Sequence, residues 1–294
     1  NLDLDEYMSI LAQAIAEPVL DNRVKSFTRA ALTIIEGVLH YTSLENKTLA
    51  DFFDLLTDES LLKIGNRLDK YNATLDEPNR SIKKAIKQIK DCYTKGAVNE
   101  FGSGVSTYLS EGINFLGIDA IYNMVRQSNT DQVFDIMEYL KGDADIYLII
   151  PPHMVERSAK FVKLFLGVLR SGFTYGSAYL KSEYYPIVLD EVAQLGYVKD
   201  IEVLYEVLRF EGAILKLFFQ DLSQLKVFAQ KEEMFKSFDV LQFFEVQGLA
   251  NIEFIQRIAG RMTIENRSVS ERDKTGFLEK DTNVSKSDQG TDFF

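Results

Sequence analysis

The stretch YYPIVLDEVAQLGY, residues 184–197, decides how the second half of this chain is interpreted. Its short apolar run predicts a buried strand, and Pro186 stands near the start, where a missing N–H donor costs little. The run ends on two adjacent carboxylates, Asp190 and Glu191. Ligands of open α/β sheets bind beyond the carboxyl ends of the strands, so these acids mark a candidate site. Such a pair also ends many strands without any chemistry, and the fragment alone leaves both interpretations open.

Strand-like and helical patterns alternate on both sides of this stretch. Further strands are predicted at 143–152, 213–220 and 240–246, and helices at 155–172, 198–212, 231–238 and 250–260. Because the strands are apolar on both faces, we expect an α/β fold: a parallel sheet with helices on both faces. The final stretch is polar and weakly periodic, which predicts loop or disorder.

The first half of the chain, residues 1 to about 135, has helical periodicity almost throughout. Apolar side chains recur at spacings of three and four in 4–20 and 24–41. Thr48 is a plausible helix cap, and a further helix is expected within 76–96. This half is predicted to be an all-α domain, with the glycine-rich stretch FGSGVSTYLSEG, residues 101–112, as a flexible joint between helices.

The composition of the chain argues against several classes of protein. The chain has 294 residues, 46% of them hydrophobic, and a formal net charge of −11, which argues against a protein that coats nucleic acid as a whole but not against a local basic patch. A single cysteine, Cys92, excludes an intramolecular disulfide and is interpreted as structural. With only His40 and His153 besides, a His/Cys zinc site is not expected, and His153 is interpreted as a capping or surface residue.

A second polar signal follows the next predicted strand. LFFQDLSQL puts Gln220 at its carboxyl end, where an amide can contact a γ-phosphate or a water molecule. Nucleoside triphosphatases place an acid that holds Mg²⁺ at a strand end, with a second acid that orients or deprotonates the attacking water. Two neighbouring strand ends with Asp-Glu and Gln therefore favour a nucleotide site more than either fragment does alone.

Four motifs in series carry a family resemblance. They are YLIIPP, PIVLDEVAQLG, LRFEGAILKLFFQDLSQLK and FFEVQGLANIEFIQRIAGRMTIENRSVS. In this order and spacing they resemble the type IV secretion coupling proteins, the TraG/TraD-like conjugation ATPases, closely over residues 140–272 and more loosely before. The resemblance implies a RecA-like motor with an inserted all-α domain. Residues 1–135 would be the all-α domain that binds cargo or an adaptor, 136–272 the second half of the RecA-like nucleotide-binding domain, and 273–294 a polar, disordered tail.

The resemblance also implies a function, partners and a location. Family members are hexameric ATPases on the cytoplasmic face of the bacterial inner membrane. They recruit relaxase–DNA complexes or effector proteins, with adaptor or chaperone proteins and other secretion-system subunits, and deliver this cargo to the secretion channel. Position by position, Asp190 matches the acid that holds Mg²⁺ beside ATP, Glu191 the catalytic glutamate and Gln220 the sensing amide. No trans-acting arginine can be assigned, although Arg257 and Arg261 are candidates.

One departure from the family is serious. The phosphate-binding loop, G-x-x-x-x-G-K-[ST], does not occur in this chain. In the family that loop and the membrane helices lie upstream of the all-α domain, and this chain starts with Asn1 rather than Met. We therefore expect a central segment, monomeric or bound to a partner, that neither binds ATP well nor hydrolyses it alone. The alternatives are a catalytically inactive pseudo-ATPase acting as an interaction protein, and a metal-dependent hydrolase built on the Asp-Glu pair.

One helical stretch is strongly basic. In 76–96 the lysines Lys83, Lys84, Lys87 and Lys90 fall largely opposite an isoleucine-rich face. The pattern fits a surface that meets DNA or cargo, and it also fits an ordinary solvated helix face.

Overall fold

The computed structural model describes residues 4–16, 24–126, 135–182, 184–206, 208–228, 238–244, 248–259, 266–269 and 284–287. The chain divides into two compact units, residues 1–218 and 219–294.

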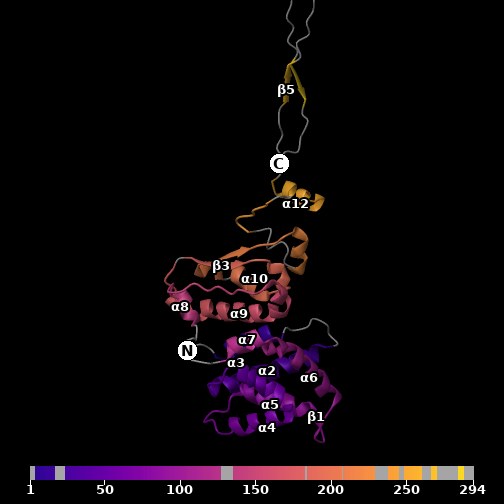
Figure 1. Cartoon of the computed structure of the whole chain (residues 1–294), viewed down its shortest axis with the longest axis vertical. Coiled ribbons are helices and arrows are strands. Elements are labelled where there is room, and N and C mark those ends of the chain that lie inside the picture. Colours follow the sequence, from indigo (N-terminus) through magenta and orange to yellow (C-terminus); the bar gives the residue numbers. More distant parts are fainter. Residues whose placement is uncertain are drawn as a thin grey trace, which may run out of the picture. The chain divides into compact units, whose positions relative to one another are not determined.

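The first half of the chain is helical, as its periodicity predicts (Figure 1). The helices are α1 (Leu4–Ile15), α2 (Lys25–Leu44), α3 (Leu49–Asp58), α4 (Leu61–Asn72), α5 (Arg80–Asp91), α6 (Glu100–Ile113) and α7 (Asp119–Val125), with the 3₁₀ helix η1 (Asn114–Gly117) before α7. The strands β1 (Tyr93–Thr94) and β2 (Ala97–Val98) form a small antiparallel hairpin after α5. Thr48 caps α3 through a reciprocal capping box with Asp51, which confirms the predicted start of that helix.

Helix α2 is central to the buried core of this half. It packs against α1, α5 and α6, and Ile34, Ile35 and Val38 on it are fully buried. At Gly37 the approach of α5 is so close that an added Cβ would lie 2.3 Å from the Cβ of Ala85 and 2.9 Å from the carbonyl oxygen of Ser81. The absence of a side chain at Gly37 therefore sets the spacing of α2 and α5.

The glycine-rich stretch 101–112 is part of helix α6 and not a flexible joint, so that prediction was wrong. The side chain of Asn99 caps the helix by accepting a hydrogen bond from the N–H of Gly102 at 2.7 Å. A Cβ at Gly102 would lie 2.3 Å from the carbonyl oxygen of Cys92. Gly102 therefore permits a close contact between two backbone segments. From the local sequence alone, a glycine with this role cannot be distinguished from a glycine in a flexible linker.

The rest of the first unit mixes helices with a parallel strand pair. It contains α8 (Ile136–Leu140), η3 (Pro152–Met154), α9 (Val155–Gly176), η4 (Ser177–Tyr179), β3 (Tyr185–Leu189), η5 (Val192–Leu195), α10 (Lys199–Glu206), η6 (Leu208–Glu211) and β4 (Ala213–Leu217). Strands β3 and β4 pair in parallel, with Tyr185 opposite Ala213 and Leu189 opposite Leu217. Two of the predicted strands and their parallel pairing are therefore confirmed.

The two faces of the β3–β4 pair differ. On one face Tyr185 and Ile187 are buried, and the ring of Tyr185 packs edge-on against Phe173 of α9 with centroids 5.4 Å apart. On the other face the side chains of Val188 and Ile214 are 57% and 39% exposed. Helices on both faces were predicted, but among the described residues they cover only one.

The segment 143–152 was predicted to be a strand, and that prediction was wrong. Residues 144–151 have no helical or strand assignment, and the side chains of Tyr147 and Ile149 are 82% and 87% exposed. An apolar run becomes a strand only where a neighbouring backbone satisfies its hydrogen bonds, and no described segment forms such a ladder with it. The described part of the predicted strand 240–246, residues 240–244, has no strand either.

The second unit contains η7 (Leu222–Phe228), α12 (Leu249–Ala259), β5 (Asn266–Val269) and β6 (Val284–Ser287). Helix α12 confirms the helix predicted at 250–260. Strands β5 and β6 pair antiparallel, so residues 284–287 form a strand where loop or disorder was expected. Apart from Phe238, the helix predicted at 231–238 lies outside the described residues.

Candidate functional site

The candidate site begins where β3 ends. The N–H of Phe218 donates to the carbonyl oxygen of Leu189 at 3.0 Å, and the N–H of Val192 donates to the carbonyl oxygen of Phe218 at 3.3 Å. These two bonds continue the parallel ladder past both strands. They fix the turn that follows β3 to the carboxyl end of β4.

Asp190 and Glu191 lie on this turn. Asp190 is exposed, and its Oδ1 accepts a hydrogen bond from the N–H of Glu191 at 3.0 Å. Glu191 is half-buried and has a φ of +48°, in the left-handed region that non-glycine residues seldom adopt. The Nε2 of Gln194 donates a hydrogen bond to the carboxylate of Glu191. A carboxylate held this way on a strained turn is typical of a functional position.

A buried cation lies near the end of the same turn. A Cβ at Gly196, whose φ is +69°, would lie 3.9 Å from the Nζ of Lys163. The side chain of Lys163 on α9 is only 9% exposed. Lys163 was not predicted as a site residue, although a lysine between the apolar Val162 and Leu164 was an available signal.

Gln220 belongs to the second unit and is described by its own contacts. It is exposed, and its N–H donates to the Oε1 of Gln224 at 2.8 Å. The next residue, Asp221, accepts from the N–H of Ser223 at 2.7 Å and from the Nδ2 of Asn251 at 3.0 Å. Hydrogen bonds with Ser223 and then Asn251 lower the pKa of Asp221 to about 2. Asp221, which was not among the predicted site residues, therefore ties the start of η7 to helix α12.

The remaining candidates from the sequence are His153, Arg257 and Arg261, together with a metal site at the two acids. Among the described residues, no group of three or more His, Cys, Asp or Glu side chains could hold a metal ion. His153 is exposed on η3. Arg257 lies on α12, and Arg261 lies outside the described residues.

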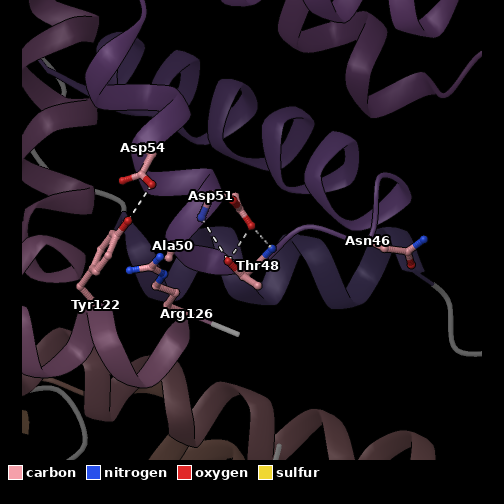
Figure 2. A pocket seen from close by; sticks show the side chains of 7 residues that line it. All are labelled: Asn46, Thr48, Ala50, Asp51, Asp54, Tyr122 and Arg126. Carbon is pink, nitrogen blue, oxygen red and sulfur yellow. Dashed lines mark hydrogen bonds between the residues drawn. The ribbon is translucent and has the colours of Figure 1, made fainter. Parts of the chain in front are cut away.

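A separate polar pocket of about 320 Å³ lies in the helical half (Figure 2). Its lining residues are Asn46, Thr48, Ala50, Asp51, Asp54, Tyr122 and Arg126. The Oη of Tyr122 donates to the Oδ2 of Asp54 at 2.7 Å, and this bond raises the pKa of Tyr122. The N–H of Thr48 donates to Asp51 at 2.8 Å, which lowers the pKa of Asp51. Asp51 thus caps α3 and Asp54 joins α3 to α7, which gives this pocket a structural role.

The class of protein follows from similarity to a known family. Residues 26–291 match the family model described as "Type IV secretory system Conjugative DNA transfer". The chain therefore belongs to this family, the type IV coupling proteins, as the four motifs predicted.

Individual relatives agree with this assignment. The chain is 26% identical to the type IV secretion system-coupling protein VirD4 of Bartonella quintana over 184 residues, which are 61% of this chain and 28% of that protein. It is 22% identical to the probable conjugal transfer protein TraG of Sinorhizobium fredii over 224 residues, 71% of this chain and 34% of that protein. The plasmid coupling protein TrwB, solved in complex with the non-hydrolysable GTP analogue GDPNP, has the same fold over 79% of this chain and 51% of its own, with a TM-score of 0.51 and 12% identity.

The chain thus spans about a third of the curated relatives it matches and about half of the solved one. In the part of the chain that the structure describes, no helix is both long and apolar enough to cross a bilayer.

Proposed function

We propose that this chain is the part of an ATP-driven type IV coupling protein that contributes the catalytic acids of the motor and the helical domain that receives cargo. The observation that carries the proposal is the turn with Asp190 and Glu191, fixed to the carboxyl ends of two parallel strands in a member of this family. This is the edge of an α/β sheet at which ligands bind. The solved relative TrwB, crystallised with a nucleotide analogue, supports a nucleotide as that ligand.

The side chains suit the roles that we assign to them. Asp190 presents an exposed carboxylate, the kind of oxygen ligand that Mg²⁺ prefers, and in the complete protein it would hold Mg²⁺ beside ATP. When bound, Mg²⁺ would neutralise part of the negative charge of the phosphates. Glu191 would orient the attacking water and take up its proton, and Gln220 would sense the γ-phosphate. The phosphate-binding loop would come from a part of the complete protein beyond this chain.

The same proposal gives the two halves of the chain different roles. Residues 136–272 would be the second half of a RecA-like nucleotide-binding domain, which the parallel β3–β4 pair against α9 supports. Residues 1–135 would recruit relaxase–DNA complexes or effector proteins, directly or through an adaptor. The complete protein would act as a hexamer on the cytoplasmic face of the inner membrane.

The test is the substitution Glu191→Gln in the complete protein, with Glu211→Gln as the control because Glu211 is an exposed glutamate near β4. Loss of a general base lowers turnover by about 10²- to 10⁴-fold, so ATP hydrolysis should fall by that factor in the first variant and stay unchanged in the second. Unchanged turnover in Glu191→Gln would refute the role of Glu191. If the wild-type protein neither binds nor hydrolyses ATP, the pseudo-ATPase alternative is correct.

A further inference from the structure

The helices α4 and α5 concentrate positive charge in an otherwise acidic chain. Together they carry eight Lys and Arg residues, which are Lys63, Arg67, Lys70, Arg80, Lys83, Lys84, Lys87 and Lys90, and only two carboxylates, Asp69 and Asp91. The chain as a whole has a formal net charge of −11. The turn between the two helices adds Asp76 and Glu77 and does not cancel this excess.

Six of these eight cations have no carboxylate partner among the described residues, and three of the six are Lys83, Lys84 and Lys87 on α5. Lys90 pairs with Asp69 at 3.1 Å and Arg67 pairs with Glu59, but no ion pair is found there for Lys83, Lys84 or Lys87. All three of these lysines are exposed. A cluster of cations left without internal partners attracts an external anion.

The scaffold holds these lysines in a fixed row. Ile82, Ala85, Ile86 and Ile89 bury the opposite face of α5 against its neighbours, and α5 lies between α2 and α4 (Figure 1). Lys83, Lys84 and Lys87 fall within five consecutive residues of α5, so they extend over about 6 Å of helix axis at 1.5 Å per residue. One strand of a nucleic-acid duplex presents a phosphate about every 3.4 Å along its axis, so a surface of this length faces about three phosphates.

The composition of the surface favours a nucleic acid over a lipid bilayer. A helix that binds a membrane surface needs an apolar face to insert beneath the headgroups. The apolar face of α5 is inside the core, and its exposed residues are all charged.

We propose that the surface formed by Lys83, Lys84 and Lys87 on α5, flanked by the cations of α4, binds the phosphate backbone of a nucleic-acid strand. The inference rests on the proposed function, because it assigns a DNA contact to a named face of the helical half. It does not depend on the ATPase roles of Asp190 and Glu191.

The experiment is a fluorescence-anisotropy titration of the chain against a labelled DNA single strand and the corresponding duplex, between about 50 and 200 mM salt. The variant Lys83→Glu/Lys84→Glu/Lys87→Glu is compared with the control Lys25→Glu/Lys181→Glu/Lys216→Glu. The control reverses three exposed lysines elsewhere and has the same formal charge. Circular dichroism verifies that both variants are folded.

We expect the wild-type chain to bind and the α5 variant to bind about tenfold or more weakly. The slope of log K against log salt should shrink by about 2 for a single strand, because three phosphate contacts are lost. The control should bind within about twofold of wild type. No binding by wild type, an unchanged α5 variant, or equal losses in both variants would overturn the proposal. Binding to phosphatidylserine vesicles but not to DNA would overturn it in favour of a membrane surface. None of these outcomes affects the ATPase test of Glu191.

Discussion

The Nε2 of His40 lies 3.2 Å from the Oδ1 of Asp5, with the His40 side chain fully buried and that of Asp5 63% exposed. The contact joins α1 to α2. Burial lowers the pKa of His40, and the charges of Asp5 and Glu36 oppose that shift without reversing it. His40 is therefore neutral near pH 7, and its protonation would place a cation inside the helical core.

This predicts a stability that falls on mild acidification. The folded-state pKa of His40 lies below the unfolded value of about 6.5, so the unfolded chain takes up the proton first. The stabilisation is complete above pH 6.5 and is lost as the pH falls through the interval below it. Urea denaturation at about pH 7.5 and pH 5.5 should show this loss in the wild type and a smaller one in His40→Gln. Equal losses in the two proteins would show that His40 does not control the effect.

Gly37→Ala should destabilise the fold because the new Cβ meets α5. The added atom would lie 2.3 Å from the Cβ of Ala85 and 2.9 Å from a backbone oxygen, and neither neighbour is a flexible side-chain end. Overpacking of this kind costs about 1–3 kcal/mol in the free energy of unfolding. Gly112→Ala is the matched control, since its closest contact is 3.3 Å, and denaturant titration should show a smaller loss. If the two substitutions had the same effect, steric contact at Gly37 would not explain it.

The Cys92 thiol should be unreactive in the native protein. It is fully buried, and burial raises its pKa to about 11, so very little thiolate exists at neutral pH. Ellman's reagent should detect no thiol in the folded chain and one thiol per chain after denaturation. Rapid reaction under native conditions would contradict the structural role that we assign to Cys92.

Asn251→Ala should raise the pKa of Asp221 towards its ordinary value. The Nδ2 of Asn251 donates to the ionised carboxylate of Asp221, and this bond is among the interactions that lower the pKa of Asp221 to about 2. Removing a donor to the charged form makes that form less favourable. An NMR titration of the Asp221 carboxyl carbon would measure the shift. Gln256→Ala, on the same helix, should leave the pKa unchanged, and an upward shift of equal size there would contradict a specific role for Asn251.

Local patterns predicted much of the fold. The isoleucines of α5 recur at helical spacing, and all of them are buried. The short apolar runs of β3 and β4 could be recognised as strands, and they pair in parallel as expected. Asp190 and Glu191 stand at the end of β3, so their place on the sheet edge could also be predicted.

Other features depend on partners that are distant in the sequence. The apolar run at 146–150 meets the same local criteria as β3, but no neighbouring backbone completes a ladder with it among the described residues. Gly102 looks like a linker residue until the carbonyl group of Cys92 is placed against it. Asp221 has no distinguishing mark in the sequence until Asn251, thirty residues later, supplies its hydrogen bond.

The sequence by itself therefore determined the family, the helical first half and the strand that presents the two acids, because short-range periodicity and ordered motifs carry this information. Tertiary structure alone decided which apolar runs became strands, which glycines permit close contacts and which distant side chain, Asn251, binds Asp221. These features are set by atoms that meet only after folding, and the free energy of such contacts is not encoded in any single stretch of the chain.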